Sequence, residues 1–261
     1  MENIKLSYQD FVATVTLNRP DVRNAFNEIT IAEITRVFRD LDTNDSIRAI
    51  VLAANGPAFC AGADLNWMKK MADYTHEENL ADAGQLAEML RTIYSCSKPV
   101  VAKVQGDCYA GGMGLVAACD IAVSVDTANF CLSEVRLGLI PATISPYVIK
   151  AMGESAARRY FITAERFTAA EAHRTGFVHE VVTADALDGK LAEIVKALVS
   201  NSPNAVKQAK CLVQDVASRE LTPALIAATV EGIAQIRASD EGREGVRSFL
   251  EKRKPGWLAG S

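Results

Sequence analysis

The chain has 261 residues, enough to bury a large core in one domain or in one domain with a small appendage. Hydrophobic residues make up 49% and charged residues 23%, as in an ordinary soluble enzyme. The net charge of −4 gives no basic surface for nucleic acid. No apolar run approaches the ~20 residues of a membrane span, and the N-terminus lacks the apolar stretch of a signal peptide. We therefore expect a cytoplasmic protein.

The six cysteines form no C-x-x-C pair and have no metal-ligand spacing with the three histidines. Most of them stand in apolar surroundings. We expect reduced, buried thiols and no metal site. The cysteines are Cys60, Cys96, Cys108, Cys119, Cys131 and Cys211.

The first third of the chain alternates strand and helix. Apolar alternation predicts a strand over 11–17, one apolar helix face lies within 34–41, and 49–53 reads as a buried strand. This second strand runs into a loop of small residues, 55–65, in which Asp64 is placed to cap a short helix carrying Trp67 and Met68. A capping box at Thr75 then predicts a helix that continues to the Lys98-Pro99 stop.

The segment 100–115, VVAKVQGDCYAGGMGL, repeats that order. A β-branched run predicts a buried strand, Gly106 and 110–112 break it, and a helix is expected from Met113 onward. The free N–H groups at such a helix start can bind a phosphate or an oxyanion. Two loops of small residues thus open at the carboxyl ends of strands, where α/β folds place ligands.

The glycines of the second loop allow other interpretations. Residues 112–117 fit the dinucleotide pattern G-x-G-x-x-A, and Glu134 lies about 20 residues on. A Rossmann turn, however, runs from the strand straight into its first glycine, whereas 106–111 intervene here. A P-loop lacks its Gly-Lys-Ser/Thr. The small residues could also serve close helix packing alone.

The remainder of the chain begins with strands expected at 121–125 and 129–132 and turns helical from Gly153. Thr168 and Glu171 form a capping-box pattern, and Ser202-Pro203 and Thr222-Pro223 each read as a helix start. We divide the chain into an α/β core, 1–195, and a C-terminal helical subdomain, 196–261, whose apolar helix faces indicate packing against the core or another subunit.

At this point the chain resembles the enoyl-CoA hydratase/isomerase (crotonase) superfamily over nearly its whole length. Residues 59–65 (FCAGADL) are similar to its F-x-A-G-A-D-L segment, and 105–112 to its glycine-rich partner. Further matches are 17–20 (LNRP) with 24–26 (NAF), 119–122 (CDIA) and 137–141 (LGLIP). The resemblance implies an α/β fold, a crotonase-like spiral of repeated ββα units with a C-terminal helical subdomain.

The resemblance also implies catalytic groups. The N–H groups of Ala63 and Gly112 would bind the thioester carbonyl of an acyl-CoA and stabilise its enolate. Glu134 matches one of the two glutamates that commonly share the proton transfers. The position of the other glutamate is occupied by Gly114. Asp107 and Tyr109 are nearby candidates to orient water, though each can equally serve turn geometry.

Substrate contacts follow from the same resemblance. Coenzyme A would lie along 18–25 and 61–65, with Arg23 on its phosphates, and the segment near Phe249 and Lys252 would reach the adenine-nucleotide end, often across a subunit boundary. Arg136 could meet a distal carboxylate of the substrate. The expected substrate and CoA contacts are Arg23, Ala25, Ala61, Asp64, Leu65, Gly111, Arg136, Phe249 and Lys252.

We predict an enoyl-CoA hydratase that adds water to a short or branched 2-enoyl-CoA. Residues 133–146 (SEVRLGLIPATISP) resemble the bacterial methylglutaconyl-CoA hydratase branch of leucine or terpene breakdown. A 3-enoyl-CoA isomerase using the single glutamate, a non-catalytic acyl-CoA-binding member and a nicotinamide oxidoreductase remain as alternatives. We expect no cofactor, since CoA is part of the substrate, and, from the resemblance, a homotrimer or homohexamer.

Overall fold

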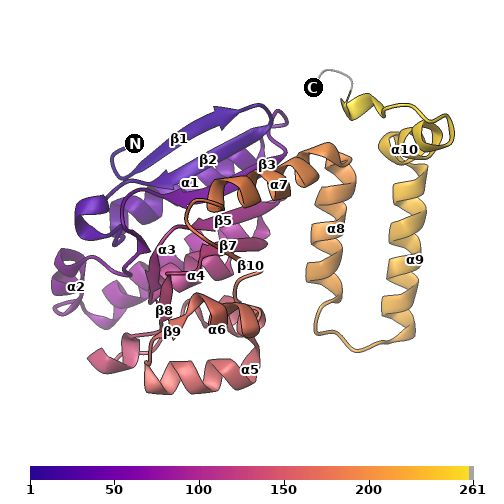
Figure 1. Ribbon diagram of the computed structural model, residues 1–261. Coiled ribbons are helices and arrows are strands. Elements are labelled where there is room, and N and C mark those ends of the chain that lie inside the picture. The colour runs from indigo at the N-terminus through magenta and orange to yellow at the C-terminus, as the bar shows by residue number, and fades with distance from the viewer. Residues whose placement is uncertain (259–261) are drawn as a thin grey trace.

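The computed structural model describes residues 1–258 (Figure 1). It contains two sheets. The larger has six strands in the order β1-β2-β3-β5-β7-β10, and the smaller has the order β4-β6-β8-β9. The strands are β1 (Ile4–Gln9), β2 (Val12–Leu17), β3 (Ala49–Ala54), β4 (Ala58–Cys60), β5 (Val100–Val104), β6 (Asp107–Tyr109), β7 (Ile121–Val125), β8 (Asn129–Cys131), β9 (Phe167–Thr168) and β10 (Glu180–Val182).

Each central strand of the large sheet leads directly into a strand of the small sheet. Thus β3 continues as β4, β5 as β6, and β7 as β8, and each pair is followed by helix. Pairing is parallel throughout except for β1 with β2 and β8 with β9. This repeated ββα unit confirms the expected spiral.

Four of the α-helices begin at the sequence signals described above. Asp64 caps α2, Thr75 forms a complete capping box, and Ser202 and Thr222 cap helices that start with proline. The helices are α1 (Glu28–Asp42), α2 (Leu65–Met71), α3 (His76–Ser95), α4 (Gly111–Ala117), α5 (Ser145–Thr163), α6 (Ala169–Arg174), α7 (Leu187–Ser200), α8 (Pro203–Val216), α9 (Pro223–Ala238) and α10 (Asp240–Leu250).

Three expectations about helix starts and caps differ from the structure. The helix expected from Met113 begins at Gly111, and the helical region expected from Gly153 begins at Ser145. The box at Thr168 is half formed, because the Glu171 carboxylate bonds Tyr160 and Arg174 instead of reaching back to the cap.

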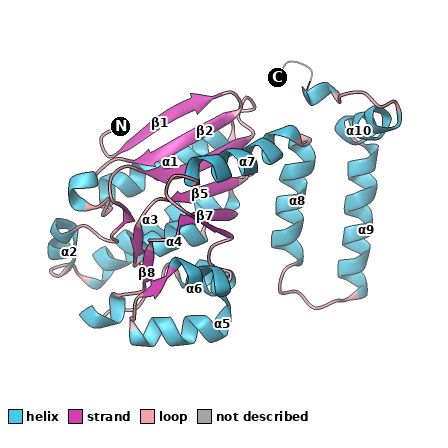
Figure 2. Ribbon diagram, in the orientation of Figure 1, coloured by secondary structure: helices cyan, strands magenta, loops and turns pink. Residues whose placement is uncertain are grey.

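The hydrophobic core lies around the large sheet. Strands β3 and β5 are buried on both faces, α1 packs against α3, and α7 packs against β3, β5 and β7. The expected domain division at 195/196 falls inside α7, which still lies on the sheet. Figure 2 shows the strands confined to one part of the molecule, with α8, α9 and α10 beside it. None of the helices in residues 1–258 has the length and hydropathy needed to cross a membrane.

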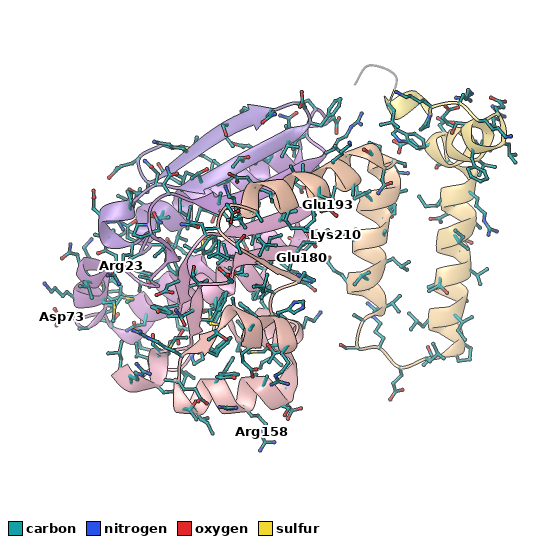
Figure 3. All side chains as sticks on the ribbon, in the orientation of Figure 1. Arg23, Asp73, Arg158, Glu180, Glu193 and Lys210 are labelled. Atoms are coloured by element: carbon teal, nitrogen blue, oxygen red, sulfur yellow. The ribbon has the colours of Figure 1, made fainter. Side chains whose placement is uncertain are left out.

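An ion pair holds α8 to the sheet. Lys210 Nζ lies 2.7 Å from Asp120 Oδ2, and that oxygen also accepts the Val100 amide at 2.7 Å. The same ammonium donates to the Lys98 carbonyl. Lys210 points toward the core from α8 (Figure 3). Among the described residues, α9 makes no such ion pair with the sheet, and it stands apart from the sheet (Figure 1).

Candidate active site

The first loop of small residues joins β4 to α2. Ala63 forms an isolated parallel bridge with Phe26: the Phe26 amide donates to Gly62 O at 2.9 Å, and the Asp64 amide donates to Phe26 O at 3.0 Å. In a parallel bridge the central residue turns its own N–H to the opposite side. The Ala63 amide therefore points away from Phe26, and it has no hydrogen-bond partner within residues 1–258.

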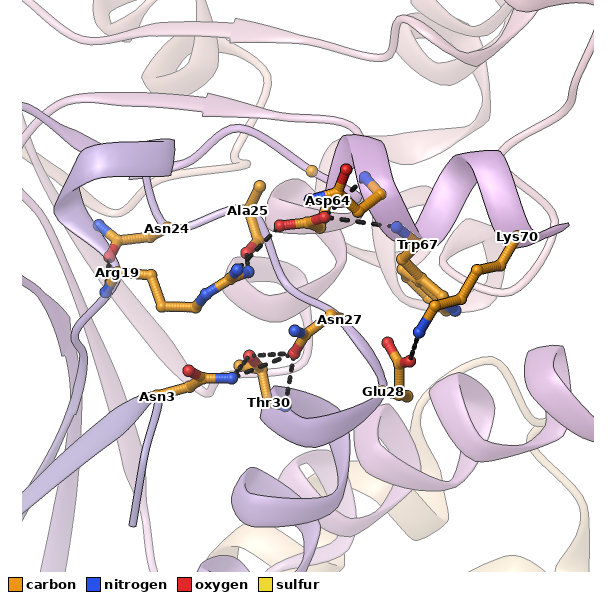
Figure 4. A network of polar contacts seen from close by, with 12 residues as sticks. Asn3, Arg19, Asn24, Ala25, Asn27, Glu28, Thr30, Asp64, Trp67 and Lys70 are labelled. Atoms are coloured by element: carbon orange, nitrogen blue, oxygen red, sulfur yellow. Dashed lines mark hydrogen bonds and ion pairs between the residues drawn. The ribbon is translucent and has the colours of Figure 1, made fainter.

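Polar side chains hold this loop from the N-terminal segment (Figure 4). Arg19 donates to the Ala25 carbonyl at 2.5 Å and to Asp64 Oδ2 at 2.9 Å. The buried Asn24 donates to the carbonyls of Asn55 and Ala58 at 2.8 and 2.9 Å. Asp64 Oδ1 caps α2 by accepting the amides of residues 66 and 67. Asp64, expected as a substrate contact, is thus a buried structural anchor of the loop.

The second loop joins β6 to α4. Ala110 has φ 47° and ψ −122°, a conformation that a residue with a Cβ adopts only under strain, and its amide donates to Cys131 O at 2.8 Å. The two residues after it open α4, where first-turn amides have no partner in the helix. Within the described chain the Gly111 and Gly112 amides have no other acceptor. The loop thus offers two adjacent free N–H groups.

The two loops touch. A Cβ placed on Gly62 would lie 3.9 Å from the Gly111 nitrogen, and one placed on Gly112 would lie 2.8 Å from both the Cβ and the carbonyl oxygen of Cys60. At Gly112 so close an approach is possible only without a side chain. The sequence pairs Ala63 with Gly112, and the structure adds Gly111, whose nitrogen lies beside the first loop. The pairing of Ala63 with Gly112 stays a prediction.

Glu134 begins a short 3-10 helix, Glu134–Leu137, that follows β8. Its Oε2 is buried and has no hydrogen-bond partner in residues 1–258. Burial raises the pKa of this carboxyl above its ordinary value of 4.5. Cys131, three residues earlier at the end of β8, accepts a hydrogen bond from the Ala110 amide. Glu134 therefore follows closely after the strand that is bonded to the second loop. A desolvated carboxyl with one unpartnered oxygen is suited to proton transfer.

Gly114, which replaces the second glutamate, is closed off by Ile144. A Cβ on Gly114 would lie 2.9 Å from Ile144 Cβ and closer still to its Cγ2, with Leu90 Cδ2 at 3.5 Å. Ile144 is 2% exposed. No second carboxylate fits at this position. Gly114 is thus covered by Ile144 and Gly112 by Cys60, so the α-carbons of the dinucleotide pattern offer no approach to a pyrophosphate.

Asp107 and Tyr109 bond to each other rather than standing free. The Tyr109 hydroxyl donates to Asp107 Oδ2 at 2.6 Å, while Asp107 Oδ1 accepts the Asn129 amide at 2.9 Å. Burial, reinforced by this carboxylate, raises the pKa of Tyr109 to about 12. The pair joins β6 to β8 and thereby supports the second loop.

The expected coenzyme A contacts lie in two places. Ala25 is buried, Ala61 is half-buried, and Leu65 is exposed at the start of α2. Arg23 is exposed beside the first loop, where its carbonyl accepts the Ala61 amide at 3.0 Å (Figure 3). These four residues lie in or next to the first loop.

The remaining expected contacts lie elsewhere. Arg136 is exposed on the 3-10 helix of Glu134 and donates to the Ala164 carbonyl. Phe249 and Lys252 are exposed on and just after α10, which Figure 1 places on the far side of α8 and α9 from α2. Within one chain they are not brought to the two loops.

Sequence reasoning missed Phe26 and Ile144 as parts of the site. The sequence marks Phe26 only as part of a family motif, and nothing in it places Ile144 over Gly114. Residues 1–258 contain no group of three His, Cys, Asp or Glu side chains that could hold a metal ion, and all six cysteines are free.

Comparison with known proteins bears on this geometry. The sequence profile of the enoyl-CoA hydratase/isomerase family matches residues 7–259. The chain is 35% identical over 252 residues to the mevalonyl-coenzyme A hydratase of Aspergillus fumigatus, covering 94% of this chain and 91% of that one. It is 30% identical over 256 residues to the short-chain-enoyl-CoA hydratase of Clostridium acetobutylicum, covering 97% of each.

Two solved structures superpose closely on this chain. An enoyl-CoA hydratase from Shewanella pealeana superposes with a TM-score of 0.95 at 43% identity, covering 98% of this chain and 96% of that one. Pseudomonas aeruginosa AtuE superposes with a TM-score of 0.94 at 35% identity, covering 98% and 99%.

Proposed function

The chain belongs to the enoyl-CoA hydratase/isomerase family, and from this premise we propose that it adds water across the 2,3 double bond of a short or branched 2-enoyl-CoA. The observation that carries the proposal is the buried, unpartnered carboxyl oxygen of Glu134, on the strand end that is bonded to a loop of free amides.

The amides would act on the thioester carbonyl. Ala63 from the first loop, with Gly112 or its neighbour Gly111 from the second, would donate to the carbonyl oxygen, on which negative charge grows as the enolate forms. One aligned donor of this kind is worth roughly 3–4 kcal/mol. Backbone donors held by strands need little reorganisation during the reaction, which is why two such loops suit this chemistry.

Glu134 would then transfer both protons. Its carboxylate takes a proton from water as the water oxygen bonds to C3, and the C2–C3 electron pair moves through C2 onto the thioester oxygen. The resulting carboxylic acid returns a proton to C2, which collapses the enolate. The sum is one water added across one double bond, and the carboxyl returns to its starting form. A raised pKa makes Glu134 a stronger base than an exposed glutamate.

For the acyl group we propose 3-methylglutaconyl-CoA or a similar branched thioester. Arg136 supports this choice, because it shares the 3-10 helix with Glu134 and has no carboxylate partner within residues 1–258. A distal carboxylate on the acyl chain is the kind of group its guanidinium binds.

A specific observation also favours a 3-enoyl-CoA to 2-enoyl-CoA isomerase. Moving a proton between C2 and C4 needs one carboxyl group and no water, and Ile144 occupies the space that a second carboxylate needs. The amides and Glu134 would keep the same roles.

For the assembly we propose a homotrimer or homohexamer. The apolar side chains of α9 are exposed, Val230 at 60% and Ile233 at 47%, and a cavity of about 650 Å³ lies between α8 and α9. Exposed apolar side chains gathered along one helix are typical of a subunit interface. Phe249 and Lys252 would then approach a neighbour's site. Light scattering coupled to size-exclusion chromatography gives the subunit number, and a monomer would overturn the proposal.

Absorbance of the conjugated enoyl-thioester band separates these functions. A hydratase removes the band of crotonyl-CoA or 3-methylglutaconyl-CoA, whereas an isomerase generates the band from a 3-enoyl-CoA. Glu134→Gln should lower either rate by about 10²–10⁴-fold. Glu154→Gln, at an exposed position on α5, is the matched control and should leave the rate unchanged. An active Glu134→Gln enzyme would refute the proposed role.

A further inference from the structure

Phe26 contacts both loops of the site. Its backbone brackets Ala63 through the hydrogen bonds to Gly62 and Asp64, at 2.9 and 3.0 Å. Those bonds fix the direction of the Ala63 amide, because the residue between them must turn its own N–H away. The first donor of the site is therefore oriented by the main chain of Phe26.

The ring of Phe26 reaches the second loop. A Cβ on Gly111 would lie 2.9 Å from Phe26 Cε1 and closer still to Cζ, so the tip of the ring rests against the Gly111 α-carbon. Phe26 is 1% exposed. The side chain of one residue thus supports the loop that carries the second donor, while its backbone holds the loop that carries the first.

The ring is itself held from behind. Trp67 packs against it with a centroid separation of 5.9 Å and an interplanar angle of 52°. The Trp67 indole N–H donates to Asp82 Oδ1 on α3 at 3.0 Å, which fixes the indole in turn. A ring with two side-chain torsions, wedged between Trp67 and Gly111, has no space in which to move away from the loop.

We propose that Phe26 is a positioning residue that sets the separation of the two amide donors in the oxyanion site, an inference that rests on the proposed function of that site. The oxyanion must lie about 2.7–3.1 Å from both donors, and an error near 1 Å can reduce the rate by about 10²-fold. Hydrogen bonds within either loop alone do not fix the distance between them.

The test is Phe26→Leu. This variant keeps the backbone hydrogen bonds but replaces the ring by a shorter side chain that does not reach Gly111. The probe is butyryl-CoA carrying ¹³C at the thioester carbonyl, which is saturated and does not react. Isotope-edited infrared spectroscopy of the bound probe reports how strongly the carbonyl is polarised. Kinetics with crotonyl-CoA give kcat and KM. The matched control is Phe38→Leu, another fully buried phenylalanine, on α1.

In the wild type the carbonyl band should move to lower frequency on binding. In Phe26→Leu it should return toward the free value, with kcat lower by about 10- to 100-fold and KM changed by less than about threefold. Phe38→Leu should lose comparable stability and keep the wild-type band and kcat. Phe26→Met, closer in volume, provides the same readout if the leucine variant does not fold.

A Phe26→Leu protein with the wild-type band and kcat would overturn the positioning role and leave Phe26 as a core residue. A wild-type band that does not shift would overturn the oxyanion site itself, and with it this inference. The two failures are distinguished by which protein shows the unexpected spectrum.

Discussion

The loop before α2 is held mainly by hydrogen bonds, whereas the loop before α4 is held mainly by close packing. Arg19, Asn24 and Asp64 bind carbonyls and amides around the first loop. In the second, glycine α-carbons rest on Phe26 and Cys60, and the first turn of the following helix rests on Ile144. A hydrogen bond can lengthen at modest cost, but an added atom in a close-packed contact has no space. The second loop should therefore be the less tolerant of substitution.

Among substitutions that disturb the packing of the two loops, the largest loss of kcat is expected at Gly112. Gly112→Ala places a methyl group 2.8 Å from the Cβ and carbonyl oxygen of Cys60, so the second loop must shift. We expect a stability loss of about 1–3 kcal/mol and a fall in kcat of about 10²-fold. Urea unfolding and crotonyl-CoA kinetics measure the two.

The matched control is Gly84→Ala on α3, where an added Cβ meets nothing within 4 Å. Alanine there should stabilise the helix by about 0.4–1 kcal/mol and leave kcat unchanged. If Gly112→Ala behaves like Gly84→Ala, packing does not hold the second loop.

A second change tests whether the packing extends along α4. Gly114→Ala should cost about 1–3 kcal/mol, because its methyl group collides with Ile144. Ile144→Ala should cost about 2–5 kcal/mol by leaving a cavity. The double variant should be more stable than the sum of the two predicts, by about 0.5–3 kcal/mol. Additive losses in a double-mutant cycle of unfolding free energies would contradict the proposed contact.

Smaller losses are expected in the polar loop. Asp64→Ala removes the cap of α2 and the partner of Arg19, and should cost about 1–2 kcal/mol. Asp64→Asn retains a capping oxygen and should cost less. Thermal unfolding compares the stability of the two variants. KM for crotonyl-CoA should rise more in the alanine variant. Equal losses would show that the ion pair with Arg19, not the cap, fixes this loop.

The smallest effect concerns pH. Burial raises the pKa of Glu134 in the folded protein, so the unfolded chain ionises first as pH rises from about 4.5. Stability contributed by the protonated carboxyl is present below that value and is lost as pH rises through the folded pKa. Glu134→Gln removes the titration and should therefore be more stable than wild type at pH 7 and similar at pH 4. Thermal unfolding at both pH values checks this. A stability difference between variant and wild type seen only at pH 4 would contradict a raised pKa of Glu134.

Much of the fold was readable because its signals are local. The caps at Asp64, Thr75, Ser202 and Thr222 start helices where expected, and the β-branched runs form β3 and β5. The strands β4 and β6 were missed, since each has three residues and lies in a stretch interpreted as loop. Their pairing depends on tertiary contact rather than on periodicity.

The candidate site likewise has a part that the sequence predicts and a part that it does not. Glu134 and the two loops could be named from motif and resemblance, since glycine and small residues mark close approach. Phe26 and Ile144 could not, because a lone aromatic in a loop and an isoleucine before a helix look like ordinary core residues. Their roles depend on which glycine each one meets, and that is set by the packing of segments distant in sequence.

The contact between Gly114 and Ile144 also constrains how this protein can evolve. Introducing a glutamate at position 114 while isoleucine remains at 144 would place the new side chain in occupied space and should destabilise the fold. A smaller residue at 144 must come first, and alone it leaves a cavity. Positions 114 and 144 are therefore sterically coupled, and a second carboxylate at 114 would require changes at both of them.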